Sequence, residues 1–295
     1  MSTTGHMERA MHTDWSGERG LKWRANLGAM EAMLAPVDAP LLRALQVDTP
    51  AAVADVGCGG GDTARRLAED APAGSRVDGF DISAELIEAA NHRRRAQNSS
   101  RLSYQVADVA VTLADAPYDR LTSRFGVMFF EDPPAAFANL TRWLKPDGRF
   151  AFAVWGALAD NPWIREVYET VAQLIELPPP LPDTPGPFRY ADPMAFVSLL
   201  ETAGFAGLKA EAWRGELAVG GGVAAQDAAR FALGSFGVAQ PLQSQPTLLA
   251  RAEQTLTTRY QACQREGVVR AFASVHIVSG GLPDATRPSQ RTAPL

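Results

Sequence analysis

The sequence has few cysteines and no long hydrophobic run. Two cysteines in 295 residues, Cys58 and Cys263, cannot form a disulfide framework, which indicates a reducing compartment such as the cytoplasm. No apolar stretch approaches the roughly 20 residues that cross a bilayer, and the N-terminal "MSTTGHMERAMHTDW" contains no signal-peptide core. We therefore expect a cytoplasmic protein without a membrane partner.

An excess of positive charge is also missing. The 28 Lys and Arg residues are outnumbered by 33 Asp and Glu, and the net charge of -5 provides no basic field for a nucleic-acid backbone. Cys, His, Asp and Glu show no metal-ligand spacing, so we expect no metal centre. A hydrophobic content of 46% is globular, and the length suits one large α/β domain or a core domain with a smaller companion.

Strand and helix patterns alternate between Ala51 and Trp155. The runs "AAVADV", "RVDGF", "RLSYQVADV" and "RFAFAVW" predict buried strands. Helical patterns lie between them, for example over 84–97. This alternation is typical of βαβ units and predicts a mostly parallel sheet covered on both faces.

The first strand leaves through the glycine-rich turn "DVGCGGGDTA". Glycine is favoured where the backbone needs positive φ or approaches another group closely, and open parallel sheets bind ligands at the carboxyl ends of their strands. A dinucleotide fingerprint counted from Gly57 needs a third glycine where Asp62 stands. The turn therefore indicates either a cofactor other than a dinucleotide or a tight strand–helix turn without a ligand.

Two acidic residues follow the next two strands. Asp81 lies 22 residues after Gly59 and could accept hydrogen bonds from both hydroxyls of a ribose. Asp108 follows the third strand and could accept one from an adenine amino group. For each, the alternative is an ordinary loop carboxylate.

The glycine turn, Asp81 and Asp108 together resemble the first three motifs of the class I S-adenosylmethionine-dependent methyltransferases. The resemblance runs from about Trp15 to about Gly281 and includes "LKPDGRFAFAVW". The segments "NPW", "GPFRYADP" and "LLETAGF" resemble the lid and following helix of members that act on small molecules. One departure is "GERGLKW", which places Trp23 three residues later than the "GERW" of similar chains.

The family implies an α/β fold with a seven-stranded, mostly parallel, doubly wound sheet. Its last strand, here "VVRAFASVHIVSG", is antiparallel and inserted between the fifth and sixth. The chain would then divide into five segments: an N-terminal helical cover (1–45), a cofactor-binding core (46–156), a lid insertion after strand five (157–190), the C-terminal part of the α/β domain with a helical insertion (191–281) and a disordered tail (282–295).

The resemblance also implies the cofactor, S-adenosylmethionine, and the residues that would surround it. Asp81 would hold the ribose hydroxyls, and Ile82 would pack on the adenine. The implied cofactor contacts are Asp55, Gly57, Cys58, Gly59, Gly61, Asp81, Ile82, Asp108, Val109, Ser123 and Phe125.

A general base is needed only if the nucleophile must lose a proton. His12 in the N-terminal cover and Glu169 on the lid helix are the candidates, and a solvated surface position is the alternative for both. The acceptor pocket should be apolar, although we expect about half of its candidate residues to be plain core. Those candidates are Trp15, Trp23, Met128, Phe129, Trp155, Trp163, Tyr168 and Phe188.

The expected activity is methyl transfer to oxygen, nitrogen or carbon of an apolar or aromatic small molecule of secondary or lipid-like metabolism. An NAD(P)-dependent reductase and a catalytically inactive cofactor-binding protein are the alternatives. The sequence leaves the oligomeric state, including a homo-oligomer, open.

Overall fold

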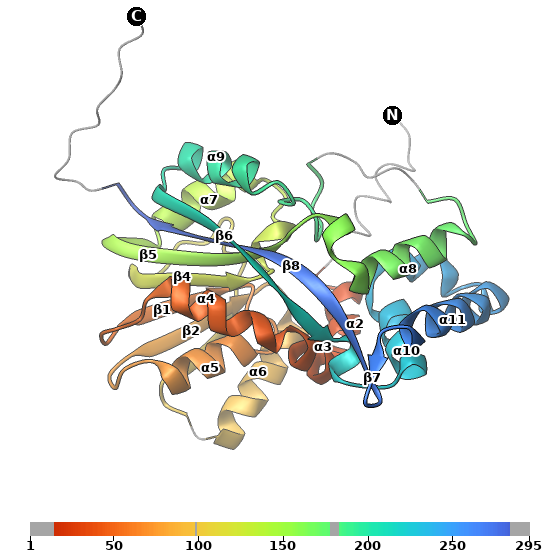
Figure 1. Ribbon diagram of the computed structural model, residues 1–295. Helices are drawn as coiled ribbons and strands as arrows, with labels where there is room; N and C mark the ends of the chain where they lie inside the picture. The colour runs from red at the N-terminus through yellow and green to blue at the C-terminus, as the bar shows by residue number, and fades with distance from the viewer. Residues whose placement is uncertain (1–14, 98, 178–182, 284–295) are drawn as a thin grey trace, which may run out of the picture.

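The computed structural model describes residues 15–97, 99–177 and 183–283. At its centre lies one twisted sheet (Figure 1). The strands are β1 (Ala52–Val56), β2 (Arg76–Asp81), β3 (Leu102–Val106), β4 (Tyr118–Arg124), β5 (Leu144–Trp155), β6 (Ala206–Ala218), β7 (Gln264–Arg265) and β8 (Val268–Gly281).

Within the described residues, seven strands lie in the order β3-β2-β1-β4-β5-β8-β6, and the short β7 pairs with β8. The pairs from β3 to β5 are parallel, whereas β8 is antiparallel to both β5 and β6. The sheet therefore confirms the expected topology, with the last main strand inserted between the fifth and sixth. Strand order reverses between β1 and β4, so the switch point lies beyond Val56 and Arg124.

Helices cover both faces of the sheet, which is why most of β1 and the second half of β5 are buried and mainly apolar. In Figure 1, α4, α5 and α6 lie on one face and α7 and α9 on the other, while α8, α10 and α11 cluster beside the long β6–β8 pair. The helices are α2 (Glu18–Ala25), α3 (Leu27–Leu34), α4 (Asp38–Leu45), α5 (Asp62–Asp70), α6 (Ala84–Gln97), α7 (Pro133–Thr141), α8 (Pro162–Ala172), α9 (Pro193–Ala203), α10 (Ala225–Ser235) and α11 (Pro246–Gln261).

Local signals explain where the helices on one face begin and end. Asp132 caps α7 by accepting a hydrogen bond from the Ala135 amide at 3.1 Å, and a proline then occupies the first turn. Asp192 caps α9 in the same way, and Gly204 ends that helix with φ of 108°. Both helices pack over the aromatic centre of β5, where Phe150 and Phe152 are fully buried.

The described part of the N-terminal cover wraps around the carboxyl ends of the strands. Helix α2 contacts α6 and α10, and α3 contacts the turn after β6. Helix α4 packs directly on the sheet through the fully buried Leu41 and Leu45. His12 and residues 284–295 of the expected tail lie outside the described residues.

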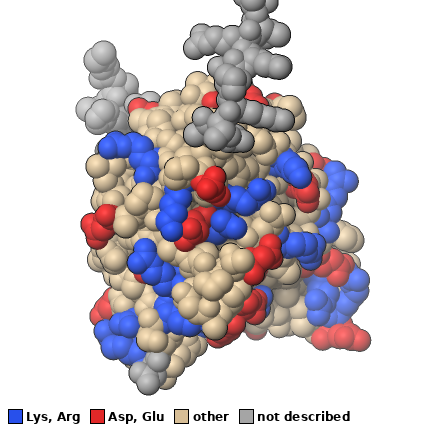
Figure 2. Space-filling model, turned by 90° about the vertical axis from the view of Figure 1, so that its left-hand side faces the viewer, with Lys and Arg blue, Asp and Glu red and all other residues tan. Residues whose placement is uncertain are grey.

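On the side of the molecule away from α8, α10 and α11, Lys and Arg are interspersed with Asp and Glu rather than gathered into a patch of one sign (Figure 2). Among the described residues, no group of three or more His, Cys, Asp or Glu side chains is placed to hold a metal ion. In that same part of the chain, every helix is too short or too polar to span a membrane.

Candidate functional site

The glycine turn after β1 meets the end of β4 at the switch point. A Cβ on Gly57, whose φ is 66°, would lie 2.8 Å from the Cα of Gly126. The buried Ser123 hydroxyl donates to the Val56 carbonyl at 2.6 Å and joins the same two strand ends. The close packing of Gly57 on Gly126 and the hydrogen bond from Ser123 thus hold the ends of β1 and β4 together, and these strand ends form the floor of the site.

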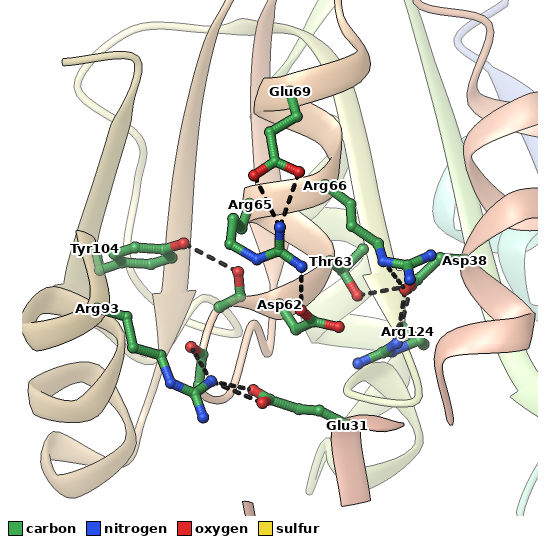
Figure 3. A network of polar contacts seen from close by, with 12 residues as sticks. Glu31, Asp38, Asp62, Thr63, Arg65, Arg66, Glu69, Arg93, Tyr104 and Arg124 are labelled. Atoms are coloured by element: carbon green, nitrogen blue, oxygen red, sulfur yellow. Dashed lines mark hydrogen bonds and ion pairs between the residues drawn. The ribbon is translucent and has the colours of Figure 1, made fainter. Parts of the chain in front are cut away.

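Contacts from outside hold the rest of the turn in place (Figure 3). Arg93 donates to the Gly60 carbonyl at 3.3 Å and to the Glu31 carboxylate at 2.7 Å. The Tyr104 hydroxyl donates to the Gly61 carbonyl at 3.0 Å. A side chain at Gly60 would collide with Leu27, and one at Gly61 with Tyr104. Packing within the protein therefore explains why both positions are glycine.

Gly59 differs from its neighbours. Its φ is 56°, but among the described residues beyond its chain neighbours the only atom within 4 Å of a Cβ built there is Nε1 of Trp23, at 3.9 Å. Its amide donates to Oδ2 of Asp81 at 2.9 Å. Gly59 is therefore the position in the turn where the backbone faces open space. It lies beside a carboxylate and beneath the tryptophan that departs from the family register.

Asp81 is fixed at the end of β2 by two backbone amides. Besides the Gly59 amide, the Ser83 amide donates to Oδ1 at 2.9 Å. Burial raises the pKa of Asp81, and the hydrogen bonds from Ser83 and Gly59 oppose that rise. Each carboxylate oxygen can accept more than one hydrogen bond, so both can still receive a hydroxyl. Ile82 beside it is 43% exposed, an apolar surface at the rim of the site.

Asp55 is a buried carboxylate near the end of β1. Only 1% of its surface is exposed, and within the described ranges neither oxygen has a partner at hydrogen-bond geometry. Burial raises the pKa of Asp55 to about 8. The positive charge of Arg124 lowers this pKa, whereas the carboxylates of Asp38 and Asp81 raise it further. The nearby amide of Ala64 lowers it slightly. Such a group is unstable as an isolated ion and is a candidate partner for a cation.

Asp55→Asn should make the free energy of unfolding less dependent on pH. In wild type the folded pKa of Asp55 is about 8, above the usual value of about 4 for the unfolded chain. The folded state therefore binds the extra proton between these values, and stability falls as pH rises. From pH 5 to pH 8 the variant should gain about 3–4 kcal/mol relative to wild type, because each pH unit between the two pKa values changes the stability of wild type by up to about 1.4 kcal/mol. Urea unfolding at both pH values measures it, and parallel pH profiles would contradict it.

Cys58 packs rather than reacts. A Cβ on Gly79 would lie 2.9 Å from its Sγ, so the thiol is directed at β2 and not at the open space above Gly59. Burial raises the pKa of Cys58, and the nearby carboxylates of Asp81 and Asp55 add to the rise. A neutral, packed thiol is a poor nucleophile.

The loop after β3 carries Asp108 and Val109. Asp108 is exposed and accepts a hydrogen bond from the Ala110 amide at 3.0 Å. The Asn139 side chain donates to the carbonyls of Val109 and Thr112, at 3.0 and 2.6 Å. Helix α7 therefore fixes the loop beside the end of β2, since β2 and β3 are paired in parallel.

Phe125 stands just after β4 in a conformation unusual for a residue with a side chain. Its φ is 67°, and its ring stacks on Trp155 with centroids 4.1 Å apart. Left-handed backbone at a non-glycine residue costs on the order of 1 kcal/mol and is often found at functional sites. The strained bend brings Gly126 against Gly57, so it shapes the switch point directly.

The predicted acceptor residues fall into two groups. Met128, Trp155 and Trp163 are core residues, at most 5% exposed. The others are partly buried and form two clusters: Trp15 lies 5.5 Å from Trp23 and 5.0 Å from Phe129 between ring centroids, and Tyr168 lies 6.4 Å from Phe188. The structure thus leaves five of the eight residues, Trp15, Trp23, Phe129, Tyr168 and Phe188, as candidates for the acceptor wall.

Glu169 lies in an ion network on the surface of α8. Its carboxylate side chain is 50% exposed and accepts a hydrogen bond from Arg259 of α11 at 2.8 Å. Arg165 lies 3.4 Å away on the same helix face. This surface ion network holds the Glu169 carboxylate toward α11, and its role as a general base stays a prediction.

Sequence reasoning missed two features of the site. Asp38 is buried and binds Nη1 of Arg124 through both oxygens, at 2.9 and 3.0 Å, and the Thr63 hydroxyl at 3.0 Å (Figure 3). This cluster ties α4, β4 and α5 together beneath the turn. The second feature is Arg19, whose guanidinium carbon lies 4.6 Å from the ring centre of Trp15. No local pattern indicates either, because the partners of Asp38 stand up to 86 residues away.

Comparisons with known proteins agree with this geometry. Residues 54–152 match the sequence model of a family described as "Methyltransferase domain". The malonyl-[acyl-carrier protein] O-methyltransferase of Pseudescherichia vulneris is 32% identical over 132 residues, 44% of this chain and 49% of that protein. The 2-phytyl-1,4-naphtoquinone methyltransferase of Trichormus variabilis is 35% identical over 99 residues, 33% of this chain and 43% of that protein. The chain thus spans about half or less of the length of these two relatives.

Solved structures support the fold over a longer stretch. The YcgJ protein of Bacillus subtilis is 17% identical, with a TM-score of 0.55 over 83% of this chain and 97% of that one. This similarity shows the fold. The domain match runs from within β1 to within β5 and includes the turns of the switch point, so residues 54–152 form a domain of the class I S-adenosylmethionine-dependent methyltransferases, whose cofactor is S-adenosylmethionine.

Proposed function

We propose that this protein transfers a methyl group from S-adenosylmethionine to oxygen, nitrogen or carbon of an apolar or aromatic small molecule. The observation that carries the proposal is the open space at Gly59, between the doubly anchored Asp81 carboxylate and the indole of Trp23. Two relatives are named as methyltransferases of 2-phytyl-1,4-naphtoquinone and of malonyl-[acyl-carrier protein], which supports a small acceptor group.

The residues present fit the cofactor. Asp81 offers two fixed acceptor oxygens to a ribose diol, and Ile82 offers an exposed apolar side chain to an adenine. Asp55 is an orphaned carboxylate, which an ammonium group on the ligand would stabilise as the ion. When bound, the cofactor supplies an activated methyl group on a sulfonium.

The chain's own contribution is to place the acceptor and exclude water. Phe129, Trp15 and Trp23 form one wall next to the switch point, and Tyr168 with Phe188 forms the second cluster. Aromatic walls of this kind orient an apolar acceptor and keep out water. Residues 157–190 would act as a lid over this site, because α8 carries Tyr168 and the segment after it carries Phe188.

Equilibrium binding separates this proposal from a nicotinamide-dependent reductase. Calorimetry should show micromolar or tighter binding of S-adenosylhomocysteine and no saturable binding of NADH. The physical reason is that Asp62, which bonds Arg65 at 2.8 Å, stands where the dinucleotide fingerprint has glycine. Methyl transfer to members of an acceptor panel then separates an enzyme from an inactive cofactor-binding protein. Preferential NADH binding would overturn the proposal.

A further inference from the structure

Asn161 directly precedes α8 and is fully buried. An asparagine at this position normally caps the helix through its side chain, but in the described part of the chain the Asn161 side chain makes no capping bond. Its amide is turned toward β8 instead. Oδ1 accepts from the Ser274 amide at 3.0 Å, and Nδ2 donates to the Ser274 carbonyl at 3.3 Å. Nδ2 also donates to the carbonyls of Gly156 and Ala157, at 3.2 and 2.8 Å. The side chain thus acts as an extra peptide group that continues the pairing of β5 with β8 past Trp155.

The same amide fixes the ring of Trp163. The indole Nε1 of Trp163 donates to Oδ1 of Asn161 at 3.1 Å. The ring centre of Trp163 lies 4.9 Å from that of Trp155, and Trp155 stacks on Phe125 at 4.1 Å with the ring planes 7° apart. We call Trp163, Trp155 and Phe125 the aromatic stack. Asn161 therefore holds one end of a stack whose other end lies at the switch point.

The far end of the aromatic stack carries backbone strain. Phe125 has a φ of 67°, and the neighbouring Gly126 packs so closely on Gly57 that a Cβ there would lie 2.8 Å from the Gly126 Cα. Strained conformations persist only where the surrounding structure holds them. The parallel ring of Trp155 is such a contact. If the stack shifts, Phe125 can return to an ordinary φ, and the glycine turn then loses the support of Gly126.

Other contacts hold α8 without holding the aromatic stack. The Tyr260 hydroxyl of α11 donates to the backbone carbonyl of Trp163 at 2.7 Å. Arg259 of α11 binds the carboxylates of Glu166 and Glu169, at 2.6 and 2.8 Å. These bonds end on the helix backbone and on its surface carboxylates, whereas the bond to Asn161 ends on a ring of the stack. The two kinds of contact can therefore be separated by substitution.

We propose that Asn161 is a positioning residue for the cofactor. By holding the indole of Trp163 it keeps the aromatic stack aligned, and the stack keeps Phe125 in the strained bend that supports the glycine turn. This inference rests on the proposed function, in which the cofactor lies over Gly59, and adds to it a residue that acts on the cofactor without touching it. The segment "NPW" then serves the floor of the site as well as the start of the lid helix.

Calorimetric titration of the full chain with S-adenosylhomocysteine, well below the unfolding temperature of each variant, tests the inference. Asn161→Ala should weaken binding about threefold to tenfold, the range that corresponds to the strain of one residue in a left-handed conformation. Trp163→Phe keeps a ring and removes only the donor to Asn161, so it should weaken binding about twofold to fivefold. It also provides the test if Asn161→Ala does not fold.

Tyr260→Phe is the matched control, because it removes a hydrogen bond to the backbone of the same tryptophan. It should lower the unfolding temperature, as Asn161→Ala does, and leave the affinity for S-adenosylhomocysteine within about twofold of wild type. The affinity of the folded chain is a readout that a loss of stability alone does not move.

A double variant shows whether Asn161 acts through the aromatic stack. Trp155→Leu interrupts the stack between Trp163 and Phe125 and should itself weaken binding about threefold to tenfold. Adding Asn161→Ala to Trp155→Leu should then cost no more than about a further twofold, because two changes that act through one set of contacts are not additive.

The other results have separate meanings. Wild-type affinity in folded Asn161→Ala or Trp163→Phe would overturn the inference, and so would two losses that multiply in full in the double variant. An equal loss of affinity in Tyr260→Phe would also overturn it, because the position of α8 and not the ring of Trp163 would then be decisive. Wild type that binds no S-adenosylhomocysteine would refute the proposed function itself.

Discussion

Gly59→Val is expected to abolish binding of S-adenosylhomocysteine by a chain that still folds. A branched side chain at this position would enter the open space between Trp23 and Asp81, where the described part of the chain places no other non-neighbouring atom within 4 Å of the Cβ. The ligand and the side chain would compete for the same volume. Calorimetry on the purified variant should show no saturable heat.

Gly207→Val is the matched control for this experiment. Gly207 in β6 also has positive φ, 63°, and no atom within 4 Å of a Cβ built there, but it lies outside the site. Both substitutions impose a backbone strain of about 1–2 kcal/mol. Only the one at Gly59 should remove binding. Wild-type affinity in folded Gly59→Val would contradict a close approach of the ligand to this turn.

Asp81→Ala should weaken binding of S-adenosylhomocysteine about 10- to 100-fold, or about 1–3 kcal/mol, because two ribose hydroxyls lose their acceptors. Part of the loss should come from the turn itself, since Asp81 also accepts from the Gly59 and Ser83 amides. Asp81→Asn keeps one acceptor oxygen and should fall between wild type and alanine.

Asp78→Ala controls for the loss of a carboxylate on the same strand. Asp78 accepts hydrogen bonds from Ser103 and Tyr118, at 2.6 and 3.1 Å, within the sheet. That variant should lose stability while keeping its affinity for S-adenosylhomocysteine. Unchanged affinity in folded Asp81→Ala would remove the ribose assignment.

The sequence predicts those parts of the fold that depend on residues close together along the chain. Glycines at Gly57 and Gly61 follow from positive φ, and α6 occupies the predicted range 84–97 because its pattern is continuous. The position of β8 in the sheet came from the family resemblance and not from local pattern, since an antiparallel insertion leaves no signature within the strand itself.

What the sequence could not predict depends on partners distant along the chain. Glu169 looks like a lid carboxylate until Arg259, 90 residues later, is seen to bind it. Arg19 looks like an exposed charge at the start of a helix until Phe129 is seen to lie over it. In both cases the side chain's role is decided by tertiary neighbours, which periodicity and spacing do not encode.

The antiparallel strand β8 has a consequence for synthesis of the chain. It pairs with β5 along Arg149–Trp155 and with β6 along Ala206–Ala218, so the edge of β5 away from β4 and the facing edge of β6 lack their partner until Val268–Gly281 has been made. A nascent chain that has reached α11 carries two unpaired strand edges, and such edges are prone to pair with other chains. Contacts this distant in sequence also form slowly. On the ribosome, the incomplete chain is therefore prone to associate with other chains until its last main strand has emerged and paired with β5 and β6.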